Sequence, residues 1–264
     1  MGSSEPGTNS GGLVVPGDLS TTPQHPPVGR PRLRHRHVWA IALTAGVAAG
    51  LFSWLGAELG RQAFRPRLFK VEILGRIVNQ PSEESQVAAD LKNATLGFAI
   101  LGGLTGLAMG LAGGLAVHSP ARGVIVALTA LAAGALVGGL ACLALLPLFY
   151  RRHVPDVNDL LTPILIHGGI WMAIGGVGGL AFAIGMRSGR HRLDAVGAAC
   201  VGGFLASILF HLLCASFYPD LSSMEPVAGT SVLRLFAMIL VTVLVAAGSA
   251  MGALGRDTFP ASFA

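Results

Sequence analysis

Charged side chains are scarce in this chain. Asp, Glu, Lys and Arg make up 12% of the 264 residues, whereas an average soluble domain has about 25%. Six long stretches contain none of the four: 38–57, 93–121, 123–150, 160–186, 195–219 and 235–255. Each approaches or exceeds the roughly 20 residues that a helix needs to cross a bilayer. A soluble protein with buried helices is disfavoured, because soluble helices of this length need a polar face.

Cysteine is also scarce, and familiar catalytic motifs are missing. Three cysteines, Cys142, Cys200 and Cys214, fall within apolar stretches, without the spacing of a zinc site or a disulfide framework. The sequence contains no G-x-S-x-G, H-E-x-x-H or Walker motif, and no paired intramembrane aspartates. The run GGLTGLAMG lacks the strand and acidic residue of a dinucleotide-binding loop. We therefore expect no catalytic residues, no bound metal and no cofactor.

The six apolar stretches predict an all-α integral membrane protein with a six-helix transmembrane domain over residues 38–256. The first 37 residues are rich in Gly, Pro, Ser and Thr and bury too little apolar surface to fold. We expect them to form a disordered cytoplasmic tail, and residues 257–264 to form a second tail. The predicted spans are 38–60, 93–118, 123–149, 161–186, 195–217 and 233–254.

The longest segment that we expect to be ordered outside the membrane is the loop 61–92. Phe69, Ile73 and Ile77 would share one face of a helix, but the run F-K-V-E-I at 69–73 also alternates as a strand would. Periodicity therefore does not decide between helix and strand. Ser82 followed by Glu83 and Glu84 predicts a helix start, because serine caps the backbone and acidic groups suit the positive end of the helix dipole. That helix would run directly into the second span.

Basic residues give the expected orientation and environment. Lys and Arg are divided almost evenly between the two sides, but Arg34, Arg36 and the cluster at 187–192 flank short segments, where the positive-inside rule carries most weight. We therefore expect both termini to be cytoplasmic, in a bacterial-type plasma membrane. The basic residues are dispersed among the loops, so nucleic acid is not an expected partner. The expected partners are the lipid bilayer and either further copies of the chain or other membrane subunits.

Glycines recur at helical spacing within two of the spans. Gly102, Gly106, Gly110 and Gly114 follow one another at every fourth residue, and Gly175 and Gly179 repeat the pattern; Gly202 occupies a similar small-residue stripe. Residues four apart share one face of a helix. Without a side chain, such a face lets a neighbouring backbone approach closely, which is the main source of helix association in lipid. We predict helix packing of the glycine-zipper kind at these residues.

The glycine runs also suggest an internal repeat. Gly102, Gly103 and Gly106 match Gly175, Gly176 and Gly179 at one constant offset, and the triplet Arg-His-Arg precedes both the first and the fifth span. Three parallel helical hairpins, at roughly 34–118, 121–187 and 190–256, would explain these matches. The alternative is chance matching, because a chain built of Ala, Gly, Leu and Val resembles itself often.

Three ionisable residues fall at membrane depth, where they are costly and often functional. Under the expected topology Glu58, His167 and His211 lie in the same half of the bilayer, so they form a candidate polar pocket for proton relay or metal binding. The alternative is that they are solvated near the interface or serve as hydrogen bonds between helices. Three functions remain open: a structural or assembly bundle, a small transporter or channel with a path along these residues, and, with least support, an intramembrane enzyme.

Overall fold

The computed structural model describes residues 35–73, 76–152, 160–189, 191–217 and 229–255. The tail predicted over 1–37 lies outside the described residues, except for its last three residues. These three belong to the first helix, which begins at His35, so the predicted tail was too long at this end. The C-terminal tail predicted over 257–264 also lies outside the described part of the chain.

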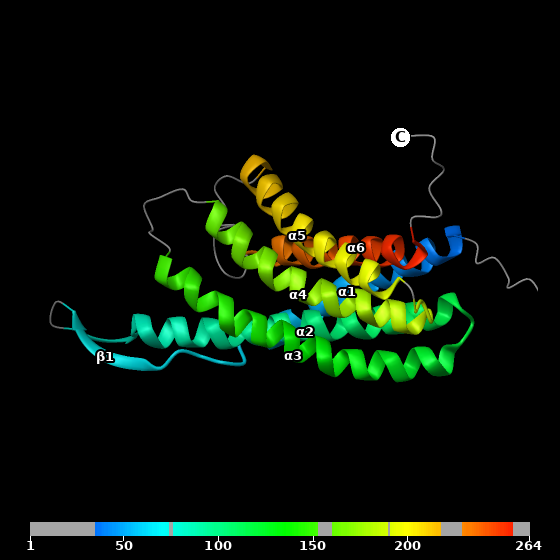
Figure 1. The fold of residues 1–264 in the computed structure, drawn as a ribbon. Helices are drawn as coiled ribbons and strands as arrows, with labels where there is room; N and C mark the ends of the chain where they lie inside the picture. Colours follow the sequence, from blue (N-terminus) through cyan, green and yellow to red (C-terminus); the bar gives the residue numbers. More distant parts are fainter. Residues whose placement is uncertain (1–34, 74–75, 153–159, 190, 218–228, 256–264) are drawn as a thin grey trace, which may run out of the picture. The chain divides into compact units, whose positions relative to one another are not determined.

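The described residues contain six long helices, all apolar and long enough to cross a bilayer (Figure 1). This is a multi-pass membrane protein, as predicted. The helices are α1 (His35–Gly60), α2 (Glu83–Ala116), α3 (Pro120–Arg152), α4 (Leu161–Gly185), α5 (Arg192–Phe217) and α6 (Ser231–Leu254). At 1.5 Å per residue, the 34 residues of α2 extend about 50 Å, which is longer than the roughly 30 Å hydrocarbon core.

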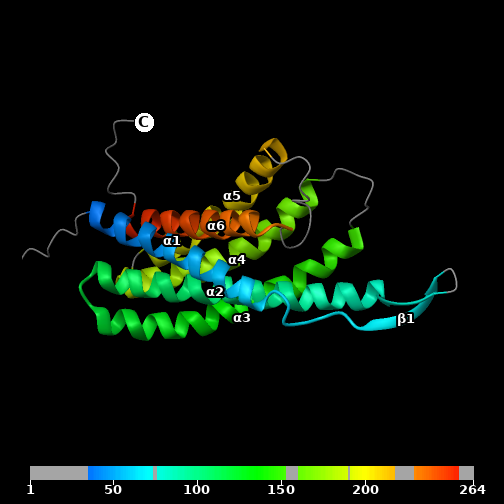
Figure 2. The same ribbon diagram turned by 180° about the vertical axis from the view of Figure 1, so that it is seen from behind.

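The helices are arranged as a closed set of neighbours. α1 packs against α2 and α6, α3 against α2 and α4, and α5 against α4 and α6. The even-numbered helices also meet one another, since α4 contacts both α2 and α6. Figures 1 and 2 show the first helix, α1, beside the last, α6. The first and last of the described helices are therefore neighbours, so residues from α1 and α6 can share a site.

The segment between α1 and α2 forms a two-stranded hairpin. β1 (Leu68–Ile73) pairs antiparallel with β2 (Arg76–Pro81), and Lys70 lies opposite Asn79. The strand interpretation of this segment is therefore correct, and the helical one is wrong. Asn93 on α2 anchors the chain before β1, because its side-chain amide bonds both the N–H (3.1 Å) and the C=O (2.9 Å) of Phe64.

The helix predicted to begin at Ser82 is present. The Ser85 N–H donates to Ser82 Oγ at 3.3 Å, so Ser82 caps α2, and Glu83 and Glu84 occupy its first turn. From there the helix continues without a break into the apolar stretch. Long side chains fill the interior between the helices, and the largest fully buried ones are Phe182, Leu101, Met109, Leu146, Ile170 and Ile174.

Candidate functional site

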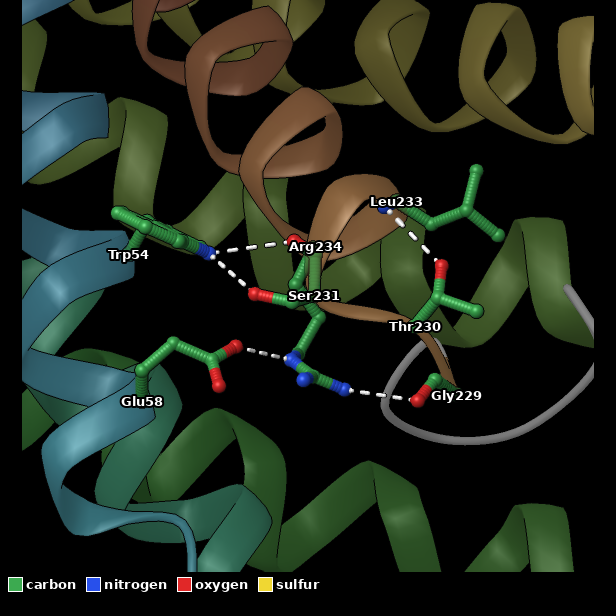
Figure 3. Close-up of polar contacts among 7 residues, drawn as sticks. All are labelled: Trp54, Glu58, Gly229, Thr230, Ser231, Leu233 and Arg234. Atoms are coloured by element: carbon green, nitrogen blue, oxygen red, sulfur yellow. Dashed lines mark hydrogen bonds and ion pairs between the residues drawn. The ribbon is translucent and has the colours of Figure 1, made fainter.

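Glu58 forms an ion pair with Arg234, which links the last turns of α1 to the first turns of α6 (Figure 3). Arg234 Nε donates to Glu58 Oε1 at 2.6 Å, and Arg234 Nη1 donates to the Gly229 carbonyl at 3.2 Å. Arg234 is 5% exposed and Glu58 23% exposed. Because a buried charge without a partner costs several kcal/mol, this pair favours keeping α1 and α6 together.

Two further contacts strengthen the same junction. Trp54, one turn before Glu58, donates its indole N–H to the backbone carbonyl (3.1 Å) and the hydroxyl (3.2 Å) of Ser231 (Figure 3). Thr230 Oγ1 accepts from the Leu233 N–H at 3.3 Å and so caps the start of α6. The cap fixes where α6 begins, and the first turn then presents Ser231 and Arg234 to α1.

His167 on α4 contacts His211 on α5. His167 Nδ1 lies 3.2 Å from His211 Nε2, and His211 Nδ1 lies 2.8 Å from the Ser207 carbonyl oxygen one turn earlier. A carbonyl only accepts, so His211 carries its proton on Nδ1. In the neutral pair His211 Nε2 must then be the acceptor and His167 Nδ1 the donor. The backbone of α5 thus sets the tautomers of both rings.

Aromatic rings surround the two histidines. Phe98 on α2 and Trp171 on α4 lie beside His167, with ring centroids 6.3 and 5.6 Å away, and Phe210 stands edge-on to His211 at 5.2 Å. His211 is fully buried and His167 is 6% exposed. Trp171 is also buried, and its indole N–H has no hydrogen-bond partner within the described part of the chain. The pair therefore lies in an apolar, aromatic environment.

The structure brings together two of the three residues of the predicted pocket and gives the third a different partner. His167 and His211 are in contact, whereas the ionic partner of Glu58 is Arg234. Arg234 was not among the predicted site residues, because the sequence was searched for acidic groups and histidines at membrane depth and its basic residues were used only for orientation. The sequence did contain a signal for this ion pair. Arg234 is a lone cation at the start of one apolar stretch, and Glu58 is a lone carboxylate at the end of another. Within the described ranges, no group of three or more His, Cys, Asp or Glu side chains is placed to hold a metal ion.

Four glycines of α2 that are spaced four residues apart face α3. A Cβ atom built on Gly102 would collide with the carbonyl oxygen of Gly134, and one built on Gly106 would collide with that of Ala130. The same holds at Gly110 and Gly114, against the backbones of Ala127 and Gly123. These contacts are between backbones, so they exclude any larger residue unless the two helices separate.

The other glycines singled out from the sequence have equivalent surroundings. A Cβ on Gly175 or Gly179 would collide with the carbonyl oxygens of Ala199 and Ala195 on α5. A Cβ on Gly202 would collide with the carbonyl oxygen of Leu244 on α6. All of these glycines therefore contact neighbouring helices of the same chain.

Comparison with known proteins adds no family to this description. The chain matches no protein-family model, no curated protein and no solved structure. Function must therefore be argued from the two polar clusters and the helix contacts.

Proposed function

We propose that this multi-pass membrane protein is a structural or assembly bundle whose spans serve packing, rather than a transporter. The observation that carries the proposal is the position of its glycines. Backbone atoms of neighbouring helices in the same chain lie directly against four of them, Gly102, Gly106, Gly175 and Gly179. Such contacts favour a rigid arrangement, because separating them loses dispersion and Cα–H···O interactions that lipid does not replace.

The interior between the even-numbered helices supports the same function. A Cβ added to Gly178 on α4 would lie 3.3 Å from Thr105 Cγ2 on α2 and 3.0 Å from Val245 Cγ1 on α6. The three helices thus meet tightly at this level, and Thr105 Oγ1 bonds the Leu101 carbonyl of its own helix at 2.6 Å. A tightly packed centre in which the Thr105 hydroxyl is hydrogen-bonded suits a scaffold better than a hydrated path.

A three-hairpin repeat is part of the proposal. The contacts α2–α3, α4–α5 and α6–α1 follow one cyclic pattern, as three successive hairpins would require. Thr105 and Gly178, which meet at the centre, are also related by the offset that relates Gly102 to Gly175. This agreement between a sequence offset and a position in space supports the proposed repeat.

The surface available for assembly is apolar. α3 exposes a row of large side chains, namely Ile125, Leu128, Leu136 and Leu140, each at least 59% exposed. These side chains contact lipid in a monomer and would contact a neighbour in an oligomer. Light scattering of the purified full-length chain in nanodiscs distinguishes the monomer from the oligomer. The protein mass per disc equals the mass of one chain in the first case and a multiple of it in the second.

Transport is the second candidate, and the buried His167–His211 contact is the observation in its favour. Proteoliposomes test the two functions with proton-sensitive and potassium-sensitive dyes. A scaffold leaves both fluxes at the level of protein-free vesicles. A proton or potassium flux through vesicles that contain the wild-type chain would overturn the scaffold proposal. If His211→Gln then abolished this flux without changing the helix content, the path would be assigned to the histidine pair. The control is His191→Gln, since His191 lies in the link between α4 and α5.

A further inference from the structure

We infer that the hairpin between α1 and α2 is a docking site for an extended acidic segment of a protein partner, which adds as a third strand to the open edge of β1. The scaffold proposal does not use this part of the chain, so the inference does not rest on that proposal. Within the described residues the sheet consists of β1 and β2 alone, and each strand has one edge that no other strand covers. The unpaired N–H and C=O groups along such an edge are a template for a further strand.

The hairpin has little support from its own side chains. All six residues of β2 are exposed, and so are Leu68, Phe69, Lys70 and Glu72 on β1. Leu68 is 62% exposed and Ile77 is 73% exposed, although both are large and apolar. A two-stranded hairpin by itself is marginally stable in water, and a third strand supplies further hydrogen bonds and apolar cover. The exposed apolar side chains therefore favour a partner at this surface.

Contacts with α2 hold the hairpin away from the membrane. The Asn93 side chain bonds Phe64, and eight residues earlier on α2 the Ser85 hydroxyl donates to the Arg67 carbonyl at 3.0 Å. The chain before β1 therefore runs along α2 for about 12 Å, from the start of the charge-free stretch toward the N-terminus of the helix. Figures 1 and 2 show the hairpin continuing beyond that end of α2. The headgroup layer on one side of a bilayer is about 5–8 Å thick, so the hairpin reaches the aqueous phase beyond the lipid.

Charge identifies the class of partner. Residues 61–82 carry a net charge of +4, because they contain one acidic residue, Glu72, and five basic residues, Arg61, Arg65, Arg67, Lys70 and Arg76. No carboxylate within the described part of the chain forms an ion pair with any of these five. Glu83 and Glu84 follow in the first turn of α2, where the helix dipole partly compensates their charge. Two copies of this hairpin would repel each other, whereas an acidic strand would be attracted.

The edge of β1 fits an added strand better than the edge of β2. β2 ends at Pro81, which has no N–H to donate, whereas β1 contains no proline. Arg67 directly precedes β1 and Lys70 lies within it, so carboxylates on a strand beside β1 come close to two cations. In this mode of recognition the main-chain hydrogen bonds supply affinity, and the side chains beside them supply specificity.

Fluorescence anisotropy of two labelled peptides tests the inference, with the full-length chain in nanodiscs of zwitterionic phosphatidylcholine. One peptide alternates threonine and glutamate and can form an acidic strand. The other has the same length and charge, but proline replaces every threonine and removes half of the backbone N–H groups. We expect saturable binding of the Thr-Glu peptide that weakens as salt is added, and binding of the Pro-Glu peptide that is weaker by about tenfold. Amide hydrogen exchange over 68–73 should slow when the Thr-Glu peptide is bound.

Two double variants with the same change in net charge separate the hairpin from the rest of the chain. Arg67→Glu with Lys70→Glu should weaken binding of the Thr-Glu peptide by about tenfold, because two attractions become repulsions. Arg187→Glu with Arg192→Glu is the control, since both arginines are exposed and lie where α4 is followed by α5, at the other end of the bundle. The control should change the affinity by less than about twofold, because salt screens charges at such a distance.

Several results overturn the inference. The wild-type chain alone does so if it shows no saturable binding, or if it binds the two peptides equally, since the contact would then be charge attraction without an added strand. Slower exchange over 76–81 in place of 68–73 would move the partner to the other edge. Equal affinities of the two double variants, with unchanged helix content, would remove the hairpin from the contact. If nanodiscs of anionic phosphatidylglycerol slow exchange over 68–73 without any peptide, the hairpin binds the lipid surface instead.

Discussion

Replacing Gly106 by alanine tests the packing of this bundle most directly. The new methyl group would point at the carbonyl of Ala130, where a Cβ would collide with the oxygen and lie 2.9 Å from the carbonyl carbon. Ordinary carbon contacts are about 3.5–4.0 Å. The backbones of α2 and α3 must therefore separate by about 1 Å at this level, since neither carbonyl carbon nor oxygen belongs to a flexible side chain.

The size of the effect follows from two opposing terms. Alanine in place of glycine favours the helix by about 1 kcal/mol. Inserting a methyl group into a filled interior costs about 1–3 kcal/mol, and the upper part of this range applies when the backbone must move. The neighbouring close contacts at Gly102 and Gly110 are weakened by the same displacement. We expect a net loss of about 2 kcal/mol in the free energy of unfolding, and a larger loss for Gly106→Leu.

Gly97 on the same helix is the matched control, because a Cβ built there meets nothing within 4 Å. Gly97→Ala should leave stability unchanged or raise it by up to about 1 kcal/mol. Both variants can be unfolded by adding sodium dodecyl sulfate to mixed micelles, with tryptophan fluorescence and circular dichroism as readouts. If Gly106→Ala and Gly97→Ala shift the midpoint equally, the close approach of α2 and α3 does not stabilise the fold, and the reasoning is wrong.

Three further perturbations test the junction of α1 with α6 and the start of α2. Glu58→Gln should lower the free energy of unfolding by about 3 kcal/mol because it removes the carboxylate charge beside the buried Arg234 guanidinium. Adding Arg234→Met should recover most of this loss. Additive effects of the two substitutions in the same detergent titration would contradict the coupling. Trp54→Phe removes both bonds to Ser231 and should cost about 1 kcal/mol by the same measurement, and an unchanged midpoint would contradict it. Ser82→Ala should cost about 1 kcal/mol at the start of α2, seen as faster amide hydrogen exchange at 83–86, while equal exchange would refute the cap.

The charge-free stretches predicted the helices because the cost of placing a charge in hydrocarbon is a property of each residue and its immediate neighbours. The helix start at Ser82 was predictable for the same reason, since a cap involves only the next three residues. The segment 68–81 was ambiguous because its apolar residues fit two periodicities. Only the pairing of Val71 with Val78 across the hairpin resolves this.

The candidate site was only partly accessible from sequence. His167 and His211 could be named because lone histidines inside apolar stretches are conspicuous. Two features depend on which helices are neighbours and how each is rotated about its axis. One is the contact between the two histidines, and the other is the pairing of Glu58 with Arg234 instead of with a histidine. Arg234 and Glu58 are far apart in the chain, so no local pattern connects them.

The sequence by itself determined that the described part of the chain contains six helices able to cross a membrane, because hydration and backbone hydrogen bonding act on each stretch separately. The tertiary structure alone decided that α1 closes against α6, which backbones lie against the glycines, and which two histidines share a hydrogen bond. These features depend on contacts between distant segments, and a one-dimensional pattern of glycine and apolar residues is compatible with several such arrangements.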